Sequence, residues 1–244
     1  MDVVILGGGQ LRDQLREAVE RRGHSARLLS RSTGFDLTRD RLVDAVDHAD
    51  AVIEAPGIVT LSASAAVGFF TRAVRQSAEA AEAWDARHVV LSIVNCSAPE
   101  NQAYGYYAGK AAEEVAAREA NPDCRIVRST QWHVFAEQML QRLSLGPFVL
   151  VPAMLTQPVD PGVVADTLVA YAVGERDDQG VDLAGPEVTT LRSMVRRIKP
   201  RRSITIPVAV PGVAAAFRNG ALLPKLGTAQ IVGPTFDEWA ARRG

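Results

Sequence analysis

The stretch VVILGGGQLR, residues 3–12, decides how the rest of the chain is interpreted. Residues 3–6 form a short, unbroken apolar run, which is typical of a parallel strand buried on both faces. Three glycines follow. After them Leu11, Leu15, Ala18 and Val19 recur at the spacing of one helix face, which predicts a helix over about 11–22. A buried strand that passes through glycines into a helix predicts the first unit of an alternating α/β fold.

The same alternation continues along the chain. Apolar runs predict strands, and segments with helical periodicity separate them. The predicted strands cover 26–29, 51–53, 88–91, 125–127, 148–151 and 181–183, and the predicted helices cover 64–82, 106–119 and 163–173. We therefore predict one α/β domain over residues 1–244, built on a Rossmann-type, doubly wound parallel sheet. Its core is expected in residues 1–150, and residues 151–244 are expected to form mainly a small C-terminal substrate lobe.

The composition is that of an ordinary globular protein and argues against several classes of function. Of 244 residues, 47% are hydrophobic and 23% are charged, and 27 Lys and Arg face 28 Asp and Glu, for a net charge of −1. That balance gives no support to binding of nucleic acid or of a membrane surface. No apolar stretch approaches the ~20 residues of a membrane span. The N-terminus lacks the basic segment of a signal peptide, and the two cysteines form no metal-binding pair, so we expect a cytoplasmic protein without a metal site.

The three glycines stand where a dinucleotide-binding fingerprint stands, after a strand and before a helix. Gly7 would permit a tight turn, and Gly9 would let the backbone approach a pyrophosphate at the helix N-terminus, beside Gln10 and Leu11. The alternative is a plain strand-to-helix turn, and we favour the cofactor site.

Arg12 occupies the place of the last fingerprint glycine. Burying its charge without a partner is too costly, so we expect its guanidinium to point outwards. It would then lie either across the mouth of the cofactor cleft, where it could bind a phosphate, or in solvent beside the cleft. We favour the first placement.

The end of the second predicted strand indicates which nucleotide is held. Folds that bind NAD usually carry an acid there, about 20 residues after the glycines, to hold the ribose hydroxyls. This chain instead has Ser30, Arg31 and Ser32. A guanidinium can bind the 2′-phosphate of NADP, which a carboxylate would repel. We therefore predict NADP(H) as the cofactor, with Arg31 as an ordinary surface residue as the alternative.

Tyr106 and Lys110 are four residues apart, which places both on one face of the predicted helix. An ammonium beside a phenol favours the phenolate, so Lys110 would move the tyrosine pKa towards the working range of a general acid/base. Ser92 ends the predicted strand at 88–91, where its hydroxyl could hydrogen-bond a substrate carbonyl. A Tyr-x-x-x-Lys spacing often arises by chance on a helix surface, and the glycine loop and Ser92 make the functional interpretation the better one.

These residues together resemble the atypical short-chain dehydrogenases/reductases, in particular their NmrA-like NAD(P)-binding branch. The resemblance covers nearly the whole chain. It rests on the order of residues 4–9, 22–24, 30–34, 87–92, 106–110, 126–132, 183–186 and 233–239. The chain departs from the family in its phosphate loop, which is one residue shorter and ends in Arg12.

The resemblance implies a role for each group of residues. Gly7, Gly9 and Arg31 would contact the cofactor, and Asp36 would meet its adenine. Cofactor-binding residues at the third strand and beyond the fifth would be Ala55, Pro56, Gly57 and Thr130. In the catalytic set Tyr106 would be the general acid/base, Lys110 would hold the ribose, and Ser92 would orient the carbonyl.

Three functions follow from this interpretation. The first is an NADP-dependent oxidoreductase that acts on a small, hydrophobic carbonyl-type substrate. The second is a non-catalytic NADP(H)-binding redox sensor of NmrA type. The third is a non-redox isomerase, cyclase or dehydratase on the same fold. Apolar residues at 132–143 and 212–223 are consistent with a hydrophobic ligand or with simple core packing, and the sequence leaves both open.

Overall fold

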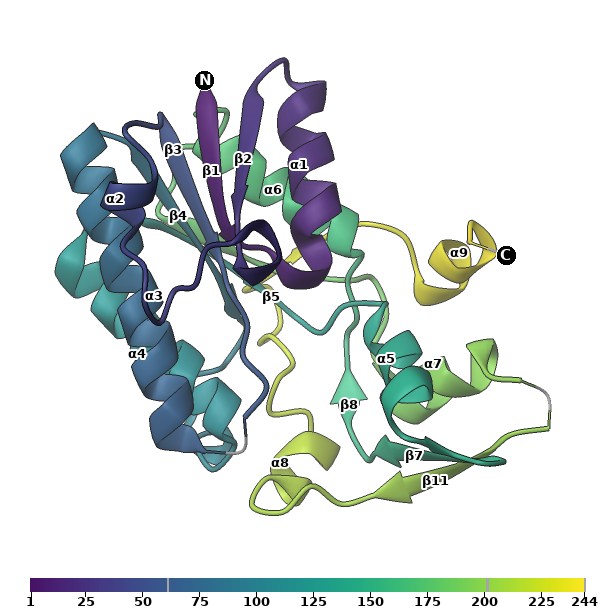
Figure 1. The fold of residues 1–244 in the computed structure, drawn as a ribbon. Coiled ribbons are helices and arrows are strands. Elements are labelled where there is room, and N and C mark those ends of the chain that lie inside the picture. Colours follow the sequence, from purple (N-terminus) through teal and green to yellow (C-terminus); the bar gives the residue numbers. More distant parts are fainter. Residues whose placement is uncertain (61, 201, 244) are drawn as a thin grey trace.

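A sheet of parallel strands forms the centre of the computed structural model, which describes residues 1–60, 62–200 and 202–243. Within these residues the sheet has seven strands, in the order β12-β9-β5-β4-β3-β1-β2 (Figure 1). Every neighbouring pair is parallel. The strands are β1 Asp2–Gly7, β2 Ser25–Leu29, β3 Ala51–Ala55, β4 Arg87–Ile93, β5 Arg125–Ser129, β9 Gly180–Ala184 and β12 Gln230–Ile231.

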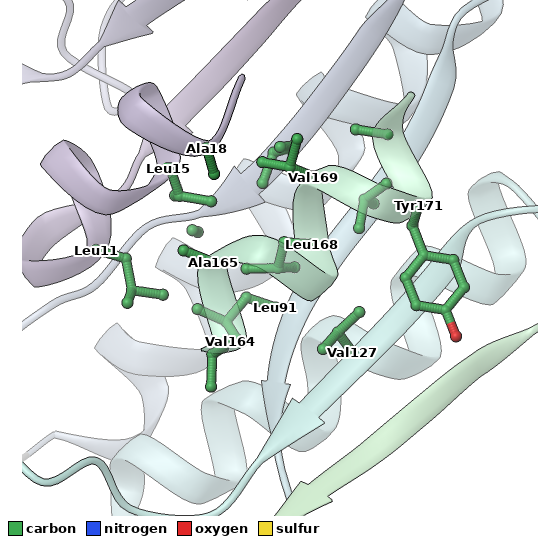
Figure 2. Close-up of a cluster of buried hydrophobic side chains, with 14 of the residues drawn as sticks. Leu11, Leu15, Ala18, Leu91, Val127, Val164, Ala165, Leu168, Val169 and Tyr171 are labelled. Carbon is green, nitrogen blue, oxygen red and sulfur yellow. The ribbon is translucent and has the colours of Figure 1, made fainter. Parts of the chain in front are cut away.

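Helices cover both faces of this sheet, because successive strand residues point to opposite sides. On one face, α1 (Arg12–Arg21) and α6 (Pro161–Ala172) pack over Val3 and Ile5. Figure 2 shows this layer, where apolar side chains of the two helices meet those of β4 and β5. Val4 and Leu6 point the other way, towards α2 (Leu42–Ala45) and α3 (Ala63–Trp84), and α4 (Gly105–Ala120) lies beside α3. The predicted doubly wound fold is therefore confirmed.

The connection pattern defines one special place on the sheet. β2 lies on one side of β1, and β3 lies on the other (Figure 1). In the strand register, Gly7 at the end of β1 is opposite Ala55 at the end of β3. Ligands of open α/β sheets bind beyond the carboxyl ends of the strands at such a switch point. The fold therefore places a candidate site above Gly7 and Ala55.

A second, smaller layer of structure lies beyond the carboxyl ends of the strands (Figure 1). It contains one small sheet of β6 (Ser144–Leu145), β7 (Phe148–Pro152) and β11 (Ile204–Val208), and a pair formed by β8 (Leu155–Thr156) and β10 (Thr189–Thr190). Four short helices pack with them: α5 Phe135–Arg142, α7 Leu191–Ile198, α8 Ala214–Arg218 and α9 Phe236–Ala241. This part has its own apolar core, distinct from that under α1 and α6.

The central sheet with its helices and the smaller lobe are not separated at one point in the sequence. Helix α6 and strands β9 and β12 all follow residue 150, yet they belong to the central sheet and its cover. The smaller lobe begins before that point, with α5. Residues 151–244 therefore contribute to both parts. In the sequence, segments of the smaller lobe alternate with α6, β9 and β12 of the central part.

The predicted strands and helices of the first half are present, with ends shifted by one or two residues. The segment 132–143, treated above as a pocket-lining stretch, contains helix α5, and 212–223 contains α8. In the part of the chain that the structure describes, no helix is both long and apolar enough to span a membrane.

Candidate cofactor and catalytic site

The glycine loop adopts a backbone that side chains rarely tolerate. Gly7, Gly8 and Gly9 have φ angles of 85°, 81° and 49°, all in the left-handed region. A Cβ on Gly7 would lie 2.5 Å from the Cα of Pro56, so this loop touches the loop after β3. The Gly8 N–H donates to the Ala55 carbonyl at 2.9 Å. The structure thus brings Gly7, Ala55 and Pro56 together at the switch point.

Two glycines of these loops face open space. A Cβ added to Gly9 or to Gly57 would meet no atom within 4 Å. Gln10 is exposed, and its side-chain oxygen accepts a hydrogen bond from the Gln138 amide of α5. The exposed backbone of Gly9 and Gly57 leaves room for a ligand beside the start of α1.

Leu11 does not fit its predicted role as a cofactor contact. Its side chain is fully buried in the core under α1 and α6, and its N–H donates to the Gly8 carbonyl at 2.8 Å. The apolar side chain is more stable in that core than in a polar cleft. Leu11 therefore anchors the loop from below, and its N–H is already engaged.

Arg12 points away from the sheet. Its Nη1 donates to the Ser32 hydroxyl at 2.9 Å, and the Ser32 hydroxyl lies 2.8 Å from that of Ser30. Its Nε is also 3.8 Å from the exposed carboxylate of Asp13. Arg31 is exposed on the same turn, which is the short helix Arg31–Thr33. One guanidinium and two hydroxyls therefore meet beyond the ends of β1 and β2, and Arg31 lies between the two serines on the same turn. We call Arg12, Ser30, Arg31 and Ser32 the arginine–serine cluster.

Asp36, expected to meet adenine, is occupied by its own loop. Its Oδ1 accepts hydrogen bonds from the Thr38 N–H at 2.9 Å and the Thr38 hydroxyl at 2.7 Å. Its Oδ2 lies 3.0 Å from Nη2 of Arg39. These hydrogen bonds, with the charge of Arg39, hold the pKa of Asp36 at about 2. In this structure the carboxylate stabilises the turn after Phe35, and its oxygens are not free for a base.

Helices α3 and α4 pack unusually closely where the tyrosine and lysine lie. A Cβ on Gly105 would lie 2.9 Å from the Ala63 Cα, and one on Gly109 would lie 2.7 Å from the Phe70 ring. The missing side chains let α4 approach α3. As a result the Phe70 ring meets the Tyr106 ring edge-on at 5.3 Å, and the Lys110 Nζ lies 4.6 Å from the centre of the Phe70 ring.

The three predicted catalytic residues differ in how far they are buried. Tyr106 is partly buried at the start of α4, one turn before Lys110. Lys110 is only 2% exposed and forms an ion pair with Glu113. Ser92 is fully buried, with its hydroxyl 3.6 Å from the Cys96 sulfur. Ser92, predicted to orient a substrate carbonyl, is thus enclosed at the end of β4, and Tyr106 and Lys110 lie together on α4.

Burial dominates the acid–base properties of this set. It raises the pKa of Tyr106 above its ordinary value, although the Lys110 ammonium acts in the opposite direction. The effect expected from Lys110 is present but smaller than the effect of burial. For Lys110 itself, burial lowers the pKa, but the negative charge of Glu113 outweighs burial, so the pKa of Lys110 is raised. The tyrosine is therefore a neutral phenol and the lysine a cation at neutral pH.

The sequence analysis missed Glu54 and Glu113. Both are fully buried, Glu54 on β3 and Glu113 on α4. Two signals were available: Glu54 is the one charged residue inside an otherwise apolar strand, and Glu113 lies three residues after Lys110, on the same helix face.

The hydroxyl and the N–H of Thr130 are both engaged inside the protein. It is 2% exposed, its hydroxyl donates to the Gln157 carbonyl at 2.5 Å, and its N–H donates to the Leu183 carbonyl at 3.0 Å. Thr130, predicted to contact the cofactor, therefore links the end of β5 to Gln157 and to Leu183 of β9. Its buried hydroxyl needs such a hydrogen-bond partner.

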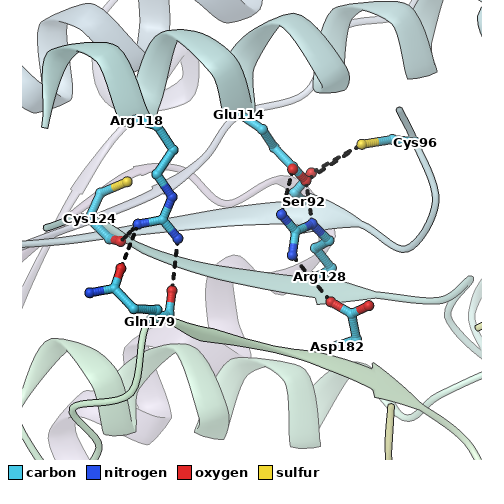
Figure 3. Close-up of polar contacts among 8 residues, drawn as sticks. All are labelled: Ser92, Cys96, Glu114, Arg118, Cys124, Arg128, Gln179 and Asp182. Carbon is cyan, nitrogen blue, oxygen red and sulfur yellow. Dashed lines mark hydrogen bonds and ion pairs between the residues drawn. The ribbon is translucent and has the colours of Figure 1, made fainter. Parts of the chain in front are cut away.

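Helix α4 is fixed to the sheet by a polar network (Figure 3). Arg128 of β5 binds both carboxylate oxygens of Glu114, at 2.7 and 2.6 Å, and reaches Asp182 of β9 at 3.3 Å. The Cys96 sulfur lies 3.5 Å from the same Glu114, and burial raises the pKa of this thiol to about 12. A two-pronged arginine–carboxylate pair restricts geometry strongly, so the network fixes the helix that carries Tyr106.

The smaller lobe covers the loop before α4. Asn95 donates to the carbonyls of Ala221 and Leu223, at 3.2 and 2.6 Å, and Phe217 packs on Tyr104 and Tyr107. The apolar residues that were candidates for ligand binding are part of this packing: Met139, Phe217 and Leu222 are each at most 7% exposed. For these three, core packing is the better explanation. No cluster of three or more His, Cys, Asp or Glu side chains suited to a metal ion occurs within the described ranges.

Comparison with known proteins supports the fold. No protein-family model and no curated protein matches the sequence. Among solved structures, the chain is similar to a dTDP-4-dehydrorhamnose reductase from Clostridium acetobutylicum, with a TM-score of 0.68, 14% identity, and 92% of this chain and 95% of that chain covered.

Two further structures contain a nucleotide. The dTDP-4-dehydrorhamnose reductase of Bacillus anthracis, in complex with NADP, has a TM-score of 0.62 and 16% identity, with coverage of 98% and 92%. The Bordetella bronchiseptica enzyme WbmG, in complex with NAD, has a TM-score of 0.61 and 14% identity, with coverage of 88% and 82%. The chain therefore shares the fold of these proteins, two of which were solved with NADP or NAD bound.

Proposed function

We propose that this protein is an NADP-dependent oxidoreductase of the atypical short-chain dehydrogenase/reductase type, acting on a small, hydrophobic carbonyl-type substrate. The observation that carries the proposal is the arginine–serine cluster. It lies at the carboxyl edge of β1 and β2, next to a glycine loop at the topological switch point. Ligands of this fold bind at that edge, and a phosphate group is what two arginines and two hydroxyls bind well.

The residues present fit a dinucleotide. Gly7, Gly9 and Gly57 would let its pyrophosphate approach the backbone, with Gln10 beside it and Pro56 forming the neighbouring wall. Arg12 and Arg31 would hold the 2′-phosphate, and Lys110 would hold the ribose. A bound nicotinamide would supply or accept the hydride.

In this proposal the protein's own residues handle the proton. Tyr106 keeps its proton at neutral pH because burial raises its pKa, so it is suited to donate that proton to the oxygen of a carbonyl being reduced. The Lys110 cation next to it would stabilise the phenolate that forms. Ser92 is enclosed against Cys96, and we assign it to supporting the strand end behind Tyr106. The partly buried rings of Tyr104 and Tyr106 favour an apolar substrate.

A second function remains in competition. Lys110 is 2% exposed and already forms an ion pair with Glu113 in the absence of a ligand. This observation favours a non-catalytic NADP(H)-binding redox sensor of NmrA type, which needs the arginine–serine cluster but no free lysine.

Nucleotide binding tests the proposal. We expect NADPH to bind at least about tenfold more tightly than NADH, a difference of about 1.4 kcal/mol, and Arg31→Ala to remove most of that preference. Arg16→Ala, an exposed arginine on α1 outside the cluster, is the matched control. Equal affinity for the two nucleotides would refute the NADP assignment.

Turnover then separates the two functions. Consumption of NADPH with a panel of small aldehydes and ketones would support the oxidoreductase. Tight NADPH binding without turnover on any member of the panel would favour the sensor.

A further inference from the structure

A cluster of buried charges lies directly below the proposed site. Glu54, Lys110 and Glu113 are 0%, 2% and 0% exposed. The Lys110 Nζ forms an ion pair with Glu113 Oε2. Both oxygens of Glu54 are buried, and neither has a hydrogen-bond partner within the described residues.

The charges of this cluster do not balance if all three groups are ionised. Two carboxylates and one ammonium would leave a net charge of −1 in a place that water does not reach. An uncompensated buried carboxylate is so costly that it takes up a proton instead. Glu54 is the carboxyl without an ion-pair partner, and burial and the charge of Glu113 raise its pKa well above the usual value. One proton therefore resides in the cluster, on Glu54.

Among the residues that the structure describes, no second cation is paired with Glu54. The titratable groups that face it are Tyr106 and Glu114 on α4, Cys124 just before β5, and His88 on the same face of β4. Burial keeps His88 neutral, with a pKa of about 4. From α3 the neighbours are the Phe70 ring and the Ser77 hydroxyl. The guanidinium on the same face of β5, that of Arg128, is bound to Glu114 and Asp182.

The position of the cluster connects it to the cleft. Glu54 directly precedes Ala55, whose carbonyl holds the glycine loop. Lys110 lies one helical turn below Tyr106. The buried ammonium therefore lies near the two carboxyls and near Tyr106, which begins the helix at the proposed site.

We propose that Glu54 and Glu113 hold one proton between them, on Glu54, and act as positioning residues for Lys110, keeping its ammonium beneath Tyr106. The inference rests on the proposed function, in which Lys110 binds the cofactor's ribose. With the proton present, Glu113 alone pairs with the ammonium, and the remaining N–H groups of Lys110 are available to a ligand. Loss of the proton makes Glu54 a second carboxylate that competes for the same ammonium and draws it into the interior.

Infrared spectroscopy tests the shared proton without any ligand. A protonated carboxyl absorbs at a frequency distinct from that of a carboxylate. We expect the wild-type protein at pH 7 to show a protonated-carboxyl band that is absent from Glu54→Gln. The band should be unchanged in Glu119→Gln, which alters an exposed glutamate on α4, the helix that carries Glu113. Absence of the band from the wild-type protein at pH 7 would overturn the shared proton.

The pH dependence of NADPH binding tests the positioning role. In the wild-type protein, and in Glu119→Gln, we expect the dissociation constant of NADPH to rise about tenfold as the pH rises and Glu54 loses its proton, the loss of one hydrogen bond from a charged group. Glu54→Gln mimics the protonated form, so its affinity should stay constant over the same range.

The outcomes are separable. If NADPH binds but the pH profiles of wild type and Glu54→Gln coincide, the positioning role is wrong and the proposed function stands. If NADPH does not bind at any pH, the proposed function and the positioning role both fall, while the infrared band still decides the shared proton.

Discussion

Replacing Arg12 with alanine tests whether the arginine–serine cluster binds a phosphate. The guanidinium of Arg12 holds Ser32 at 2.9 Å, beyond the ends of β1 and β2. Alanine removes this group and preserves the first turn of α1, because alanine is a strong helix former. The variant therefore changes the charge of the cluster and leaves the glycine loop intact.

The size of the effect follows from the exposure of the side chain. A hydrogen bond from a charged group contributes about 1.5–3 kcal/mol. The Arg12 side chain is 38% exposed, so solvent screening places it at the lower end of this range. About 1.5 kcal/mol corresponds to a rise of roughly tenfold in the dissociation constant of NADPH. NADH has no 2′-phosphate, so its dissociation constant should change little.

Fluorescence titration with both nucleotides at two salt concentrations measures these changes. Because the variant loses one phosphate contact, its NADPH binding should also depend less on salt. Arg16→Ala, one turn further along α1 and 45% exposed, should behave as the wild-type protein does. An equal loss of NADPH and NADH affinity in Arg12→Ala would show that the residue shapes the loop. Unchanged NADPH affinity would show that it has no role in binding.

Three other changes test separate parts of the structure. Tyr106→Phe should abolish turnover with little change in NADPH affinity, because only the proton donor is lost; retained activity would exclude Tyr106 as the acid. Gly7→Ala should lower the free energy of unfolding by about 3 kcal/mol or more, from backbone strain and the clash with Pro56, whereas Gly34→Ala, at φ 92° but in open space, should cost only about 1 kcal/mol. His88 has its pKa lowered to about 4 by burial, so its contribution to stability is complete above pH 6.5 and is lost as the pH falls towards 4. Urea unfolding should show a loss of about 2 kcal/mol between pH 7 and pH 5 from this residue, and His88→Leu should lose that much less; equal losses in both proteins would contradict the assignment.

The central sheet was predictable because its strands carry a strong signal. Strands buried on both faces are continuous apolar runs, as in residues 3–6, and the helices between them show one apolar face. The outward direction of Arg12 also followed from elementary physics, since a buried, unpaired guanidinium is unstable. These features depend on residues that are close in sequence.

The features that sequence reasoning missed depend on distant residues. Strand β12 has two residues, both exposed, and a segment that short shows no periodicity. The buried groups Glu54 and Lys110 come from different elements, so the charge effect between them arises only in the folded chain. Thr130 was assigned to the cofactor because it follows a strand, whereas its hydroxyl is satisfied by Gln157, a residue that no local pattern connects to it.

The late position of β12 in the chain has a consequence for biosynthesis. The outer edge of β9 is paired only by Gln230 and Ile231, with Val232 adding a hydrogen bond to Ala184. As the ribosome makes the chain from its N-terminus, β9 emerges well before these residues exist. Its unpaired N–H and C=O groups form an edge that another nascent chain can extend. Chains interrupted between β9 and β12 would keep this edge open, and we expect such fragments to aggregate more readily than the finished protein.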